Sequence, residues 1–108
     1  MELIEQYRKL ASVCADTDYS SKASVAKHNH AINQMRSAVA KSVTGEIYWP
    51  LLDEELCAKW LAFQLIELTN PPIEIRSQCF EVVTDLASSK GAIALGARMW
   101  LDEFNQGV

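Results

Sequence analysis

The sequence has few residues that break regular structure and no long apolar run. Its 108 residues include four glycines and three prolines, while 49% of residues are apolar. Such a chain is too apolar and too poor in glycine and proline to be disordered. No apolar stretch approaches the ~20 residues needed to cross a bilayer. The amino terminus is acidic and amphipathic, so we expect no secretory leader and predict one cytoplasmic domain, residues 1–108.

Cysteine and histidine are too sparse for a disulfide framework or a metal site. Cys14, Cys57 and Cys79 are odd in number and each lies on an apolar stripe, which predicts buried, reduced thiols. His28 and His30 stand two residues apart, and such a pair points to different faces of a helix. The chain also lacks a glycine-rich phosphate-binding loop, and no cysteine is spaced from His28 in a way that indicates a nucleophile and its general base. We therefore expect no metal, no cofactor and no catalysis.

Charge is placed unevenly along the chain. The net charge of −4 argues against a nucleic acid or an anionic membrane as the partner. Between Tyr19 and Gly45 the charged residues are four cations, whereas ten acids stand against four cations from Glu46 onward. The second helix is therefore basic, and the acidic C-terminal half favours a basic partner.

Apolar residues spaced three and four apart predict an all-α fold of five to six helices. The expected helices span about 2–14, 54–68 and 92–104, with a short helical turn at about 46–52. Two more are expected, one that follows Ser20 or Ser21 and extends to about Val43, and one that follows Asn70 and ends near residues 88–91. Ser20 or Ser21, Asp53 and Asn70 are the expected N-caps, and Gly45 is the expected stop of the long helix. Pro71 would occupy the first turn after Asn70, where its missing N–H costs nothing. The 54–68 helix is apolar nearly all round, which predicts a central position.

An apolar pattern recurs every eighteen residues in the second half of the chain. The corresponding positions are Cys57, Leu61, Ala62 and Leu65, then Ile75, Cys79, Phe80 and Val83, then Ile93, Ala97 and Leu101. Arg98 breaks the pattern in the third copy. A step of this length is one helix and a short turn, so consecutive helices should pack side by side. Trp60 and Trp100 fall in apolar stripes and are expected in the core.

One segment of the chain combines aromatic and acidic residues. Tyr48 and Trp49 stand between Glu46 and the acidic run from Asp53 to Glu55, and an aromatic anchor beside carboxylates suits a basic protein. Two simpler interpretations remain open: the acids favour a helix N-terminus through its dipole, and Trp49 fills a gap between helices. The candidate partner-binding residues are Glu46, Tyr48, Trp49, Asp53, Glu54, Glu55, Glu74, Glu81 and Asp85.

The stretch from Asn70 to Val83, NPPIEIRSQCFEVV, resembles the second helix of a HEAT repeat. The stretch from Leu51 to Leu65 is similar, with Ala58 where the repeat has arginine. Together with Lys27-His28-Asn29 in a long helix, the likeness extends over about residues 26–104 and resembles a small bacterial HEAT-like (armadillo-like) domain family of unknown function. This resemblance implies an antiparallel, right-handed stack of helices.

Small, acidic, helical chains of this kind are also similar to immunity proteins of contact-dependent growth inhibition and other polymorphic toxin systems. That resemblance implies a monomer that binds the C-terminal domain of its cognate toxin, often a nuclease, and covers the active site. The alternative is a HEAT-like scaffold that binds another protein and has no toxin partner. An enzyme would require a polar pocket where His28, His30 and Asp85 converge.

Overall fold

The computed structural model describes residues 2–89 and 91–106 and is all-α over that range. Its elements are α1 (Glu2–Ala15), α2 (Lys22–Ala40), the 3₁₀ helix η1 (Glu46–Asp53), α3 (Glu55–Leu68), α4 (Ile73–Ala87) and α5 (Ala92–Gln106). Within the described residues no helix is long and apolar enough to cross a membrane. The predicted helices are thus confirmed, whereas the antiparallel, right-handed HEAT-like stack stays a prediction.

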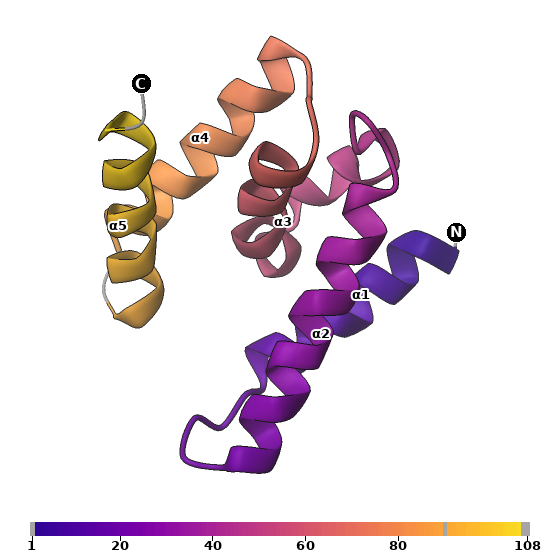
Figure 1. Ribbon diagram of the computed structural model, residues 1–108, viewed down its shortest axis with the longest axis vertical. Coiled ribbons are helices and arrows are strands. Elements are labelled where there is room, and N and C mark those ends of the chain that lie inside the picture. Colours follow the sequence, from indigo (N-terminus) through magenta and orange to yellow (C-terminus); the bar gives the residue numbers. More distant parts are fainter. Residues whose placement is uncertain (1, 90, 107–108) are drawn as a thin grey trace.

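Helix α3 lies at the centre of the molecule (Figure 1). It packs against α1, α2, η1 and α4, and α5 packs on the far side of α4. Seven residues of α3 are buried, and they include Leu61 and Leu65 at 0% exposure. A helix without a continuous polar face must cover several sides, so the central position follows from the composition of α3.

At one position of the eighteen-residue pattern, side chains in three successive helices are equally buried. Leu61, Cys79 and Ala97 occupy the same position in α3, α4 and α5, and they are 0%, 0% and 1% exposed. The side chain at this position shrinks from leucine to cysteine to alanine. The side chain of Ile93 and all of Lys90 lie outside the described residues.

Both predicted caps of the α3–α4 region are wrong, and two local features explain why. Asp53 is the last residue of η1, so Glu54 takes the cap position of α3 without a side-chain cap bond. Asn70 lies outside α4, where its backbone N–H donates to the Val43 carbonyl at 2.7 Å. A residue that precedes proline is disfavoured in the helical region, and Pro71 precedes Pro72. The helix therefore begins only after the second proline.

The boundaries of α2 are confirmed at its start and wrong at its end. The Ser21 hydroxyl accepts from the Ser24 N–H, as an N-cap does. The helix stops at Ala40, whereas the prediction continued to about Val43. Gly45, predicted as the stop, instead opens η1 with a φ of 66°, and a Cβ there would lie 2.4 Å from Leu65 Cδ2. The turn after α2 thus needs glycine both for its backbone and for its contact with α3.

Candidate protein-binding surface

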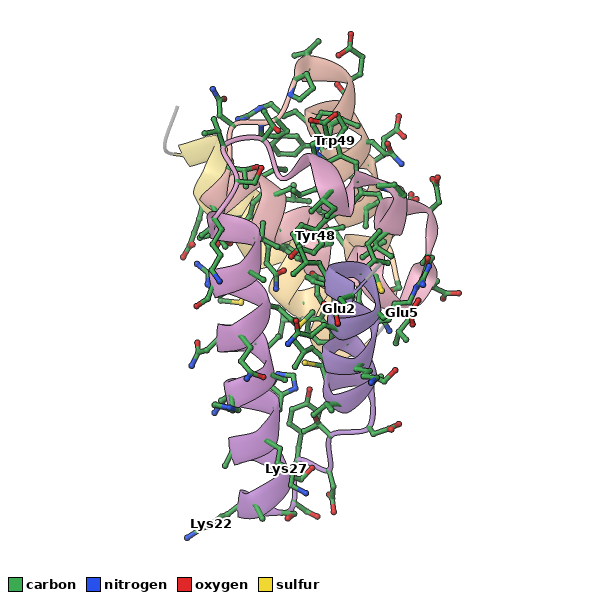
Figure 2. All side chains as sticks on the ribbon, turned by 90° about the vertical axis from the view of Figure 1, so that its right-hand side faces the viewer. Glu2, Glu5, Lys22, Lys27, Tyr48 and Trp49 are labelled. Carbon is green, nitrogen blue, oxygen red and sulfur yellow. The ribbon has the colours of Figure 1, made fainter. Side chains whose placement is uncertain are left out.

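The aromatic residues of η1 are not both available to a partner. Tyr48 is 2% exposed and packs on Tyr7 with ring centroids 5.4 Å apart. Trp49 is half-buried, and its indole N–H donates to the Thr44 carbonyl at 2.8 Å. Figure 2 shows Tyr48 among the ribbons and Trp49 near the upper edge. Tyr48 is therefore a core residue and cannot serve as a surface anchor, while Trp49 holds the turn that leads into η1.

The acidic run after η1 is divided between internal contacts and solvent. Asp53 accepts from the Gln78 side chain of α4 at 3.3 Å. Glu54 faces Arg8 of α1, whose Nε and Nη2 donate to the two carboxylate oxygens at 3.0 and 2.6 Å. Glu55, in the first turn of α3, is exposed. The segment thus pairs with α1, makes one hydrogen bond to α4, and presents Glu46, Asp53 and Glu55 to solvent.

The Arg8–Glu54 pair changes the acid titration of the protein. Hydrogen bonds from Arg8 lower the pKa of Glu54 below its ordinary value of 4.5. Partial desolvation of the carboxylate raises this pKa and the positive charge of Arg8 lowers it, so the net shift is downward. A carboxyl group with a lowered folded pKa contributes stability above its unfolded pKa. That contribution is lost as pH falls through the folded value.

We expect Glu54→Gln to destabilise the protein at neutral pH and to flatten its loss of stability in acid. The difference in unfolding midpoint between wild type and variant should be largest near pH 7 and should shrink towards about pH 3. Urea unfolding, monitored by circular dichroism between about pH 3 and pH 7, measures this difference in midpoint. Glu55→Gln, which removes a neighbouring carboxylate outside the Arg8 pair, is the matched control. A Glu54→Gln profile parallel to that of wild type would contradict the assignment.

Three of the predicted acids lie on one face of α4. Glu74, Glu81 and Asp85 are spaced seven and four residues apart, and all three are exposed. Residues at this spacing share one side of a helix. Glu81 and Asp85 also line a shallow hollow with Ser77, Phe80 and Thr84. We call Glu74, Glu81 and Asp85 the α4 acidic face. None of the ion pairs among the described side chains includes these three carboxylates.

Sequence reasoning missed the position of the two tryptophans. Trp60 and Trp100 were expected in the core, but both are half-buried at its edge. Trp100 donates to Glu67 at 2.9 Å, and the second oxygen of Glu67 accepts from Arg36 at 3.0 Å. One carboxylate therefore joins α2 and α5 across α3. The Trp100 ring also meets the Phe63 ring of α3 edge to face, with centroids 5.2 Å apart.

The cysteines and His28 make packing and hydrogen-bond contacts within the fold. The three cysteines are buried and unpaired, as predicted, and burial raises the pKa of Cys79 to about 11. His28 lies between Tyr19 and Trp60, with its Nδ1 2.9 Å from the Thr17 hydroxyl. No group of three or more His, Cys, Asp or Glu side chains in the described part of the chain is arranged to hold a metal ion.

A groove between α1, α2 and η1 could not be predicted from the sequence. Its volume is about 450 Å³. The α1 wall presents Leu3 and Leu10, the α2 wall presents polar side chains from His30 to Lys41, and Ile47 of η1 contributes a further apolar side chain. A groove needs the angle and separation of two helices, and these are not encoded in the periodicity of either helix alone.

Comparison with known proteins identifies no relative of this chain: no protein-family model, no curated protein and no solved structure matches it.

Proposed function

We propose that this protein is an immunity protein that binds the C-terminal domain of a bacterial toxin in the cytoplasm of the producing cell. The toxin domain would be a nuclease whose basic active site the protein covers. The α4 acidic face carries the proposal. It presents three exposed carboxylates along one side of a helix, and no ion pair among the described residues neutralises them.

The charge of this face suits a basic partner in two ways. A nuclease gathers cations to hold phosphates, so carboxylates in a row meet complementary charge where the nucleic acid would bind. Exposed charges of opposite sign also accelerate the encounter of the two proteins. Glu81 and Asp85 also line the shallow hollow on α4. The Phe80 ring of this hollow is already covered by Arg76 at 5.6 Å, so the hollow offers a basic partner its two carboxylates.

The aromatic–acidic segment near η1 is the weaker candidate for the same interface. Its Tyr48 is buried and its Glu54 is paired with Arg8. The exposed acids of this segment, Glu46, Asp53 and Glu55, do not form a row along one helix, Asp53 also accepts a hydrogen bond from Gln78, and Trp49 is only partly accessible. We therefore place the toxin-binding surface on α4.

The proposal predicts that reversing the charge of the α4 acidic face abolishes protection. The neighbouring gene product is the candidate toxin for a co-expression test, and cells that carry it should grow when the wild-type protein is present. Growth should fail with the triple variant Glu74→Lys, Glu81→Lys and Asp85→Lys. The association rate of the triple variant, measured by stopped-flow, should be about tenfold or more below that of the wild type. The difference between the two rates should become smaller as the salt concentration is raised. Circular dichroism verifies that the exposed substitutions leave the fold intact.

A matched double variant distinguishes the two acidic surfaces. Glu46→Lys with Glu55→Lys reverses exposed charges near η1 and should retain protection. If this pair abolished protection and the α4 variant did not, the interface would lie at η1 and our placement would be wrong. Full toxicity in the presence of the wild-type protein would reject the immunity function. Capture of a non-toxic protein through α4 would then favour the alternative HEAT-like scaffold.

A further inference from the structure

Helix α5 carries an exposed stripe that is apolar at one end and acidic at the other. Leu95 and Met99 are 53% and 58% exposed and lie one turn apart. Asp102 and Glu103 follow on the same side, three and four residues beyond Met99, and are also exposed. We call these four residues the α5 stripe. Two large apolar side chains at the same face of one helix, both more than half exposed, are typical of an interaction site.

The groove between α1 and α2 has the opposite character. Its apolar side chains are Leu3, which is 47% exposed, with Leu10 and Ile47. Its α2 wall carries Lys41 and His30, and none of the described residues that line it is an acid. In a chain of net charge −4 with fourteen acids, a groove free of carboxylates favours an occupant that brings its own.

The two surfaces match in chemistry and in length. Leu3 and Leu10 are seven residues apart on α1, and Leu95 and Asp102 are seven residues apart on α5, so each pair spans about 10 Å along its helix. An amphipathic helix binds a groove by placing apolar side chains at this spacing on the floor and polar ones at the rim. Leu95 and Met99 suit the apolar wall, and Asp102 and Glu103 suit Lys41 at the C-terminal end of α2.

Helix α5, which carries the stripe, and the α1–α2 pair, which forms two walls of the groove, lie on opposite sides of α3. Figure 1 places α5 at the left edge and the α1–α2 pair at the right, with α3 between them. Helix α5 packs on α4, and α1 and α2 pack on each other and on α3. The α5 of one chain therefore cannot enter its own groove, although it can enter the groove of another copy.

We infer that this protein self-associates, with the α5 stripe of one copy seated in the α1–α2 groove of a second copy. The inference departs from the monomer expected from the sequence and does not depend on the proposed toxin partner, since it uses neither Glu74, Glu81 nor Asp85. The contact joins two different surfaces of the same chain, so it yields a closed dimer when reciprocal and a growing series of oligomers when it is not.

Analytical ultracentrifugation of the full chain tests the inference. We expect the weight-average mass to rise with protein concentration in the wild type. Met99→Glu should leave a monomer, because it places a charge against the apolar wall. Ile73→Glu is the matched control, since Ile73 is 69% exposed and lies outside both surfaces. It should associate as the wild type does.

A charge exchange tests the register of the contact. Lys41→Glu should weaken association about tenfold, and Asp102→Lys with Glu103→Lys should do the same, since each places like charges together. Combining the three changes should restore association. Lys22→Glu, at the opposite end of α2 from the groove (Figure 2), should have no effect.

A wild-type chain that stays monomeric up to about 1 mM would overturn the inference. So would association that survives Met99→Glu, or single charge reversals that the combined variant fails to rescue. If the monomeric chain bound a different protein in the groove, that protein would be its occupant and self-association would be rejected.

Discussion

Replacing Leu61 by alanine should lower the free energy of unfolding by about 2–5 kcal/mol. Leu61 is fully buried at the centre of α3, the helix against which α1, α2, η1 and α4 all pack. The surrounding side chains belong to several helices and cannot all collapse into the space that the leucine leaves. A domain of this size has about 5–15 kcal/mol in total, so the variant loses a large part of its stability.

Urea unfolding monitored by circular dichroism measures the effect. Leu95→Ala is the matched control, because it removes the same atoms from a side chain that is 53% exposed on α5. Measured at a protein concentration low enough to keep the chain monomeric, it should change stability by less than about 0.5 kcal/mol. Equal losses in the two variants would contradict the central position of α3.

The periodic part of the fold was predictable because burial on a helix follows a fixed repeat. The eighteen-residue pattern correctly identified Leu61, Cys79 and Ala97 as one set of buried positions, and all three are at most 1% exposed. The composition of α3 likewise indicated its central place. These features depend on the order of apolar side chains within each helix, which the sequence states directly.

Features that depend on contacts between helices were not predictable in this way. Tyr48 looked like a surface anchor beside carboxylates, but it packs on Tyr7, forty-one residues earlier in the chain. Glu54 looked like a free acid, yet Arg8 of α1 pairs with it. Both errors arise in η1 or directly after it, where a proline-containing segment turns into the core. The α4 acidic face was predictable as a stripe, because its spacing belongs to one helix.

Gln64 is the clearest case of a residue whose role no pattern could assign. It is the one polar side chain among the described residues that is buried in the core, at 3% exposure. Its Oε1 accepts the hydroxyl of Tyr7 at 2.6 Å. The bond ties the middle of α1 to α3 and gives both buried polar groups a partner, which a buried polar group requires.

Breaking this bond from either side should cost about 1–3 kcal/mol, and removing both partners should cost less than the sum. In Tyr7→Phe the Gln64 oxygen is left buried without its donor, and in Gln64→Leu the Tyr7 hydroxyl is left without its acceptor. The double variant replaces the pair with apolar groups of similar size and should recover most of the loss. A double-mutant cycle by urea unfolding measures the coupling.

The loss of stability at alkaline pH gives an independent measurement on the same pair of residues. Burial raises the pKa of Tyr7 well above its ordinary value, and the nearby Cys57, Cys14 and Tyr48 add to this. A group that ionises more readily in the unfolded chain costs stability as pH rises above its unfolded pKa of 10.0. Tyr7→Phe should therefore lose stability less steeply above about pH 10 than the wild type. Two results together would show that Tyr7 and Gln64 do not depend on each other. The losses of unfolding free energy in the two single variants would add up in the double variant, and Tyr7→Phe would lose stability above about pH 10 as steeply as the wild type.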